Sequence, residues 1–267
     1  MSQDDQPMRA LKDGQSGSGS VNTVVRRGGH IVRPAGPWTK AVHGVLRHLQ
    51  AQGFVQVPQV VGLDPEGEVL TYLDGEAAMR PWPAPFLATG GLETLARWLK
   101  GYHLAMEGYR PEPQAVWRAP DAVSWSPGMV VRHGDLGPWN TIWRQKTLVG
   151  VIDWDLAEPG WPLHDVAQLA WYGVPLTTPE RCAATGVVPG PSQRQRLESI
   201  ARVHGVSIDD ILRALMEVQQ AEVDRTLLLG GQGVEPWTGF FKRGDVAQIR
   251  QDMAWLEAWR ETASHAR

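Results

Sequence analysis

Cysteine and long apolar stretches are scarce in this sequence. Cys182 is the only cysteine among 267 residues, which excludes an intramolecular disulfide bond and gives no indication of an oxidising compartment. No segment approaches the roughly 20 consecutive apolar residues that span a membrane as a helix. Residues 1–6 are polar and acidic, and they lack the basic start and apolar centre of a secretory signal. We therefore expect a cytoplasmic protein with no membrane partner.

Excess positive charge is also missing. The chain carries 26 Lys and Arg residues against 29 Asp and Glu residues, so its net charge is −3 and its pI is about 6.2. Nucleic acids and anionic membranes are bound through basic surfaces, so neither is an expected partner. The apolar fraction of 42% is typical of a globular protein, and the length fits one large domain or two lobes. Arginine supplies most of the positive charge and tryptophan is abundant, which favours a GC-rich bacterial source.

The most informative motif contains His133, Asp135 and Asn140, and it is followed by an apolar run that ends in Asp153. Phosphoryl transfer needs an aspartate that orients and deprotonates the attacking hydroxyl, and oxygen ligands that hold Mg²⁺ against the phosphates. Asp135 suits the first task, and Asn140 and Asp153 suit the second. The spacing therefore predicts a phosphoryl-transfer site.

Two other interpretations apply to the same residues. An isolated His-Gly-Asp is more often a turn with a capping aspartate. A metallohydrolase could use His133, Asp135, Asp153 and Asp155 as ligands, but such sites usually contain several histidines or bridging carboxylates. Only His164 is available as a further histidine in this segment, and a hydrolase does not require Asn140. A hydrolase is therefore less favoured than a kinase.

At these positions the chain resembles the aminoglycoside phosphotransferase and choline kinase group, which are small-molecule relatives of the protein kinases. The catalytic loop of that group reads H-x-D-x-x-x-x-N, and a short strand then delivers the metal-binding aspartate of an I-D-W/F motif. His133, Asp135, Asn140 and Asp153 match in order, and Asp165 resembles the aspartate that braces the catalytic loop from a following helix. The resemblance implies an α+β, protein-kinase-like fold: a small β-rich lobe with one long helix, and a larger, mainly helical lobe.

The two expected lobes are residues 1–75, which would bind the nucleotide, and residues 76–267, which would hold the catalytic and acceptor sites. Residues 1–15 are expected to be flexible. A Gly/Ser run at residues 16–20 precedes strand candidates at 21–26 and 30–33; such runs are often linkers, but here the run is placed to cover phosphates. The resemblance implies that the nucleotide is bound by Ser18, Gly19, Ser20, Arg33, Leu70, Tyr72 and Leu73.

Apolar periodicity predicts the remaining elements. We expect a strand pair, or the entry to a strand, at residues 55–58 and 59–63, and a further strand at 68–73. We expect helices at residues 37–52, 92–106, 166–172, 191–203, 209–229 and 246–263.

The resemblance also implies a mechanism. ATP or GTP would lie between the lobes, with Mg²⁺ on Asn140 and Asp153; Asp135 would take the proton of the acceptor hydroxyl, and His133 would hold the loop. Arg33 stands where active kinases have a lysine, and the helix at 37–52 contains no acidic partner for it. Lys40 is the alternative cation on that helix. For Asp155, a position next to the metal and a structural turn are both open.

The expected acceptor is a small-molecule hydroxyl compound: an amino sugar such as an aminoglycoside antibiotic, a choline-like alcohol or another metabolite. No long activation segment separates Asp153 from Asp165, so a protein acceptor is disfavoured. A monomer or a dimer is expected. The alternative is a catalytically weak nucleotide-binding protein with an immunity or regulatory role. Carboxylates for a cationic acceptor are available on helices, although charges there are more often solvated: Glu217, Glu222, Asp224, Glu257 and Glu261.

Overall fold

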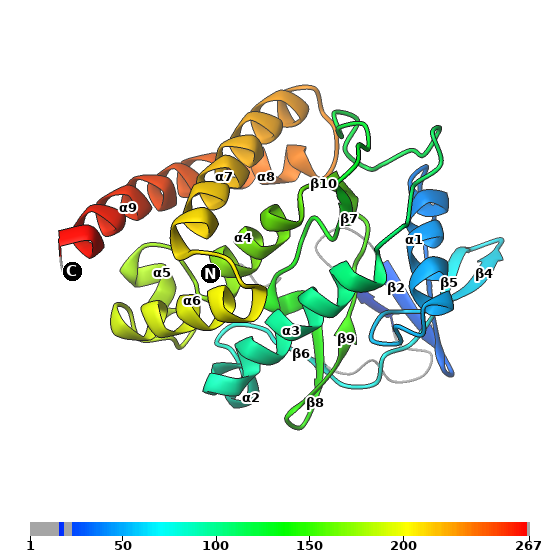
Figure 1. The fold of residues 1–267 in the computed structure, drawn as a ribbon. Helices are drawn as coiled ribbons and strands as arrows, with labels where there is room; N and C mark the ends of the chain where they lie inside the picture. The colour runs from blue at the N-terminus through cyan, green and yellow to red at the C-terminus, as the bar shows by residue number, and fades with distance from the viewer. Residues whose placement is uncertain (1–15, 19–22, 266–267) are drawn as a thin grey trace.

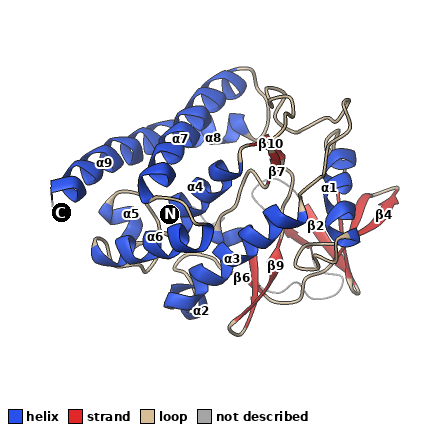
Figure 2. Cartoon of the chain, in the orientation of Figure 1, coloured by secondary structure: helices blue, strands red, loops and turns tan. Residues whose placement is uncertain are grey.

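The computed structural model describes residues 16–18 and 23–265. One end of the molecule contains a twisted antiparallel sheet with one long helix beside it, and helices make up most of the remainder (Figures 1 and 2). The expected α+β architecture is confirmed.

The sheet has the strand order β1-β2-β3-β5-β4. Its strands are β1 (Ser16–Ser18), β2 (Thr23–Arg27), β3 (His30–Arg33), β4 (Val60–Asp64) and β5 (Gly67–Thr71). Helix α1 (Thr39–Ala51) follows β3 and buries Val42, Val45, Leu46 and Leu49, the i, i+3, i+4, i+7 stripe of an amphipathic helix. The pairing of β3 with β5 sets Arg33 opposite Glu68.

Two expectations for this sheet are wrong. Ser16–Ser18 is not a loop, because it pairs as β1 with residues 23–25 of β2; Gly19 and Ser20 lie outside the described residues. Residues 55–59 form no strand. Pro58 lacks a backbone donor, and the Gln56 carbonyl accepts the N–H groups of Val151 and of the Trp98 indole instead of a ladder bond.

The chain leaves the sheet at Thr71 and re-enters regular structure at β6 (Glu76–Ala77), which belongs to a second sheet of order β6-β8-β9. The predicted lobe boundary at residue 75 falls in this connection and stays a prediction. The other strands of the helical part are β7 (Val130–Arg132), β8 (Thr141–Arg144), β9 (Thr147–Val151) and β10 (Glu158–Gly160).

The predicted helices of the second part are confirmed, with ends shifted by a few residues. They are α3 (Thr89–Ala105), α4 (Pro162–Gly173), α6 (Pro191–His204), α7 (Ile208–Gly231) and α9 (Asp245–His265). Three short helices were not predicted, since four to seven residues cannot display a full apolar stripe. These are α2 (Ala84–Leu87), α5 (Pro179–Ala183) and α8 (Trp237–Arg243).

The hydrophobic core continues directly beneath the candidate catalytic segment. Trp154 is fully buried, and its ring lies 5.2 Å from Tyr102 and 4.6 Å from His133, measured between centroids. Tyr102 donates its hydroxyl to the Val131 carbonyl on β7. The strands that carry the motif residues are thus fixed by packing against α3.

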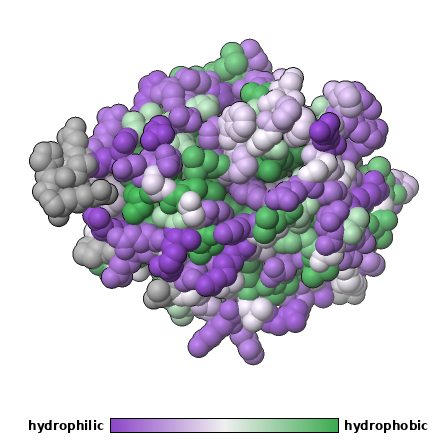
Figure 3. Space-filling model, in the orientation of Figure 1, coloured by the Kyte–Doolittle hydropathy of each residue, from purple (hydrophilic) through white to green (hydrophobic). Residues whose placement is uncertain are grey.

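The outer surface in Figure 3 is mostly hydrophilic, with hydrophobic side chains gathered over the centre of that face. Among the described residues, no helix combines the length and hydropathy needed to cross a bilayer. Cys182 is buried.

Candidate active site

His133 is buried at the start of the loop between β7 and the 3-10 turn η1 (Pro138–Asn140). Its Nε2 lies 3.0 Å from the Ile152 carbonyl, and its Nδ1 accepts the Asp135 N–H at 3.2 Å. Burial lowers the pKa of His133 to about 4, so the imidazole is neutral at pH 7 with its proton on Nε2. Both ring nitrogens form hydrogen bonds with backbone groups, as expected for a residue that stabilises the loop conformation.

Asp165 braces this loop from α4. Its Oδ1 accepts the His133 N–H at 3.3 Å, and its Oδ2 lies 3.1 Å from His103 Nε2. Gln168, one turn later, donates to the Gly134 carbonyl and accepts the Leu136 N–H, both at 2.9 Å. Two side chains of one helix therefore determine the course of the loop.

Asp135 and Asn140 are in direct contact. The Asn140 amide donates to the Asp135 carboxylate Oδ2 and to its backbone carbonyl, each at 2.8 Å, and the Trp139 indole donates to the same Oδ2 at 3.2 Å. Burial, and then the negative charge of Asp153, raise the pKa of Asp135 to about 7, whereas the two hydrogen bonds to Oδ2 act against the rise. These bonds leave Asp135 Oδ1 and Asn140 Oδ1 available for other partners.

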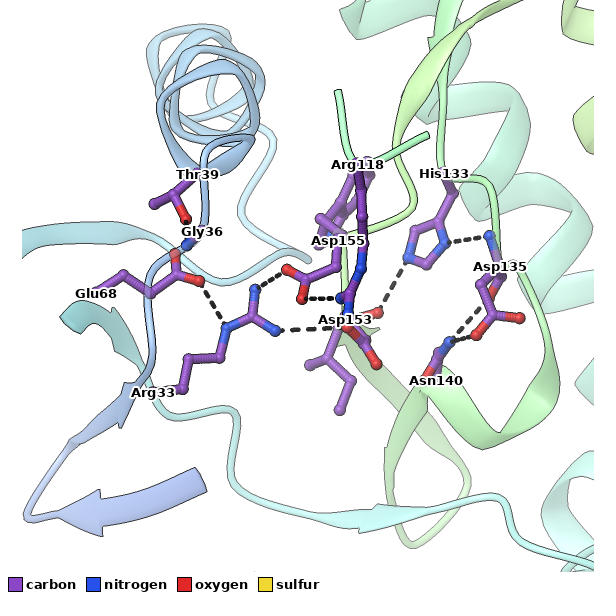
Figure 4. A network of polar contacts seen from close by, with 12 residues as sticks. Arg33, Gly36, Thr39, Glu68, Arg118, His133, Asp135, Asn140, Asp153 and Asp155 are labelled. Atoms are coloured by element: carbon purple, nitrogen blue, oxygen red, sulfur yellow. Dashed lines mark hydrogen bonds and ion pairs between the residues drawn. The ribbon is translucent and has the colours of Figure 1, made fainter. Parts of the chain in front are cut away.

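Asp153 comes directly after β9 and adopts a left-handed backbone with φ 63°, which is uncommon for a residue other than glycine. The adjacent Ile152 N–H donates to the Asn140 carbonyl at 2.9 Å. The Asp153 side chain is 47% exposed and faces the same region as Asp135 and Asn140 (Figure 4). The structure therefore brings together the three oxygen-bearing side chains named from the sequence.

Arg33 reaches the same region from the sheet (Figure 4). Its guanidinium is 2.7 Å from Glu68 Oε1, 2.6 Å from Asp155 Oδ1 and 3.4 Å from Asp153 Oδ1, and the residue is only 8% exposed. Glu68 Oε2 lies 2.8 Å from Nε2 of His43 on α1. Helix α1 has no acidic residue for Arg33, and Glu68 of β5 is its acidic partner instead. Helix α1 contributes His43, which contacts Glu68. Glu68 was missed because only strand pairing sets it opposite Arg33.

Asp155 forms two buried ion pairs, and a position for it next to a metal stays a prediction. It is buried, and besides Arg33 it binds Arg118 Nη1 at 2.9 Å; the Arg118 guanidinium lies 4.4 Å above the Trp38 ring. Asp155 therefore joins β3 to the loop between α3 and β7. The side chain of Lys40, the alternative cation, is 79% exposed and pairs with Glu112.

The other predicted nucleotide contacts that the structure describes lie in the sheet or in the connection that follows it. Ser18 ends β1, and Leu70 is a buried core residue of β5. Tyr72 donates its N–H to the Gly29 carbonyl at 2.9 Å, and its ring lies 3.9 Å beneath the Arg26 guanidinium. Leu73 is half-buried in the connection between the two sheets. Their part in nucleotide binding stays a prediction.

The donor set suits magnesium better than a hydrolytic metal centre. Within residues 16–18 and 23–265, no three His, Cys, Asp or Glu side chains form a cluster that could hold a metal, and both nitrogens of His133 are engaged. Mg²⁺ is commonly held by one or two protein oxygens together with substrate phosphates. Asn140 and Asp153 offer such oxygens, whereas the engaged nitrogens of His133 are not available as metal ligands.

A cavity of about 600 Å³ opens beside Asp135, between the catalytic loop and helices α4, α7 and α9. Of the carboxylates considered from the sequence, Glu217 and Glu222 line it. Asp224 and Glu257 are exposed and do not line it, and nothing is described of the Glu261 side chain.

Part of this chain matches a known protein family. Residues 92–194, which contain the catalytic loop, Asp153 and Asp165, match the sequence model of the phosphotransferase enzyme family. The resemblance to that family is confirmed.

A curated relative and two solved structures add to this finding. The trifolitoxin immunity protein of Rhizobium leguminosarum bv. trifolii is 36% identical over 163 residues, which cover 59% of this chain and 60% of that protein. Amicoumacin kinase hAmiN, solved with AMP-PNP, Ca²⁺ and Ami, superposes with a TM-score of 0.60 at 13% identity and covers 93% of this chain and 90% of its own. A protein of Ralstonia eutropha JMP134 assigned to the aminoglycoside phosphotransferases has a TM-score of 0.54 at 13% identity, covering 94% of both chains. The two structures confirm the protein-kinase-like fold.

We predict that Gly134→Ala disrupts the loop. Gly134 has φ 81°, and an added Cβ would lie 1.9 Å from the Leu156 carbonyl oxygen; Gly53 has φ 72°, and an added Cβ there meets nothing within 4 Å. Gly53→Ala should cost about 1 kcal/mol for its backbone conformation alone. Gly134→Ala should lower the unfolding free energy by at least about 2 kcal/mol more than Gly53→Ala, because the backbone at Leu156 must move to make room for the added Cβ. Urea unfolding of both variants tests this, and equal losses would contradict it.

The neutral state of His133 predicts a pH-dependent stability. Its pKa is lowered from 6.5 to about 4 in the folded protein, so the stabilisation is present above pH 6.5 and is lost as the pH falls from 6.5 towards 4. Between pH 7 and pH 5 the wild type should lose about 2 kcal/mol more unfolding free energy than His133→Asn. Urea titrations at the two pH values measure the difference, and parallel losses in both proteins would refute the assignment.

We expect Asp155→Asn to destabilise the protein by about 3 kcal/mol, because two buried guanidinium groups lose a charged partner. Asp74→Asn is the matched control, since Asp74 also pairs with an arginine, Arg144, but both side chains are exposed. Its cost should stay below about 1 kcal/mol. Chemical unfolding of the two variants decides the matter; a similar cost for both would show that the buried pairs contribute little.

Proposed function

We propose that this protein transfers the γ-phosphate of ATP or GTP to a hydroxyl group of a small molecule, with Mg²⁺ as cofactor. The observation that carries the proposal is the contact of Asp135 with Asn140, with Asp153 facing the same region from the end of β9. The family match over residues 92–194 supports it. Cytoplasmic location and a monomeric or dimeric state remain predictions.

The acceptor hydroxyl would meet Asp135 at Oδ1, because Oδ2 already accepts two hydrogen bonds. A pKa of about 7 suits a group that takes a proton near neutral pH. As the acceptor oxygen forms its bond to the γ-phosphorus, the bond from that phosphorus to the leaving diphosphate oxygen breaks, and the hydroxyl proton passes to Asp135. His133, Asp165 and Gln168 keep the carboxylate in place through the loop backbone.

The nucleotide would lie between the sheet and the helical part, with its phosphates near Arg33. Asn140 and Asp153 would hold magnesium through oxygen atoms, and the bound ion would neutralise charge on the phosphates. Arg33 would add a fixed positive charge, which three carboxylates already orient. Ser18 and the segment that contains Leu70, Tyr72 and Leu73 would contact the rest of the nucleotide.

A second candidate is a nucleotide-binding protein of low activity that confers immunity. The 36% identity to the trifolitoxin immunity protein favours an immunity role, although the match covers only three fifths of that relative. Phosphotransfer would itself confer immunity if the toxin is the phosphate acceptor. Mass spectrometry of a candidate toxin after incubation with the protein and ATP separates them: an added phosphate supports transfer, and binding without modification supports sequestration.

We predict that Asp135→Asn lowers the rate of phosphate transfer by at least about 100-fold, because the proton acceptor is lost. Nucleotide affinity in the presence of Mg²⁺ should stay within about threefold of wild type, since Asp135 is not a proposed metal ligand. Asp224→Asn, an identical change at an exposed position of α7, should alter neither quantity. ADP release and nucleotide titration test this; an Asp135→Asn protein with wild-type turnover would exclude the proposed role.

A further inference from the structure

The cavity beside Asp135 is electrically balanced and not acidic. Five guanidinium groups line it, and they belong to Arg80, Arg132, Arg181, Arg225 and Arg243. The carboxylates that line it are also five: Asp135, Glu158, Glu217, Glu222 and Asp245. A ligand that carries several ammonium groups would place some of them against guanidinium groups, and such like-charge contacts disfavour binding.

Several of these carboxylates are already neutralised. Glu158 is buried, and its carboxylate accepts a hydrogen bond from Arg132 at 2.6 Å. It also accepts hydrogen bonds from the two Nη atoms of Arg225, at 2.9 and 3.0 Å. Asp245 accepts Arg243 Nε at 2.9 Å. These ion pairs form part of the cavity wall and leave little negative charge on it for a ligand.

Glu222 differs from them. It is half-buried on α7, and among the described residues no hydrogen bond or ion pair within contact distance involves its carboxylate. It lines the same cavity as Asp135, the proposed proton acceptor. One turn further along α7, Thr226 is fully buried, lines the cavity, and has a hydroxyl with no partner in the described part of the chain. This side of the cavity therefore offers polar groups to a ligand.

Arg80 approaches the cavity from another element. Its guanidinium lies 5.5 Å from the Trp139 ring, and the Trp139 indole donates to Asp135. Tyr172 lines the same cavity as Arg80 and Glu222, and its ring is 4.8 Å from Trp139 and 4.7 Å from Trp171. The cavity thus offers a carboxylate without an ion-pair partner among the residues described, a guanidinium beside an aromatic ring, and an aromatic wall, and Asp135 lines it too.

We propose that the acceptor is a zwitterionic hydroxyl compound, such as a short peptide or amino-acid derivative, with one ammonium group bound by Glu222 and one carboxylate bound by Arg80. This inference rests on the proposed phosphotransfer, because it places the acceptor hydroxyl at Asp135. Trp139 and Tyr172 contact the apolar body of the ligand. A polyamine is a poor acceptor in the same cavity.

The test compares four probes: the dipeptide seryl-phenylalanine, its C-terminal amide, its N-acetyl form, and kanamycin as a polyamine. Binding is measured by calorimetry on Asp135→Asn without nucleotide, and transfer is measured by mass spectrometry on the wild type with ATP and Mg²⁺. The free dipeptide should bind at least about tenfold more tightly than each of the other three probes.

Two variants assign the ends of the ligand. Glu222→Gln should abolish the preference for the free amine over the N-acetyl form, and Arg80→Gln should abolish the preference for the free carboxylate over the amide. Asp224→Asn and Arg47→Gln are the controls, since both residues are exposed and neither lines the cavity, and they should keep both preferences.

The outcomes separate the two proposals. Tighter binding of kanamycin, no binding of the dipeptide, or preferences that survive in Glu222→Gln and Arg80→Gln would overturn the zwitterionic acceptor. Transfer to acceptors without regard to their charge would overturn it as well while leaving phosphotransfer intact. Selective binding of the dipeptide with no transfer by the wild type would support the ligand class and refute the phosphotransferase.

Discussion

The position of the Arg33 guanidinium is the constraint on which the site depends. Arg33 comes from the sheet, and Asp153 and Asp155 come from the segment after β9, so the ion pairs join the two parts of the molecule at the site. Removing a charge from water is costly, and the cost is offset here because three carboxylates surround one cation. Glu68 is itself bound by His43, so the orientation of the guanidinium also depends on α1. Arg33 is thus a planar cation whose orientation is determined by several partners at once.

The catalytic loop shows a second use of buried polar groups. His133 lies against Trp154 and stays neutral, and each of its ring nitrogens is used to hold backbone. Asp165 and Gln168 secure the loop from α4. Each group is satisfied, so the network specifies one loop conformation, and the Asp135 carboxylate keeps one oxygen available.

The charge of the cavity beside Asp135 is not determined by the carboxylates of α7 alone. Helix α7 contributes acidic residues, as its sequence indicates, but it also contributes Arg225, and arginines from other parts of the chain enter the same space. A count of carboxylates along α7 therefore overstates the negative charge that a ligand meets. The partners of each carboxylate, and not their number, determine which ligand charge is stabilised.

Local spacing by itself determined much of this protein. The five-residue interval from Asp135 to Asn140 predicted that both serve one site, and a single short turn does bring them together. Apolar periodicity located the long helices. Contacts between residues far apart in the chain could not be obtained in this way. The pairing of Arg33 with Glu68 depends on the register of β3 and β5. The pairing of Arg33 with Asp155 depends on how the sheet and the helical part pack together. Glu158 is neutralised because Arg225 extends to it from α7. Only the tertiary structure decided these contacts, because a charge is bound by whatever group packing brings within a few ångströms, and packing depends on the whole chain.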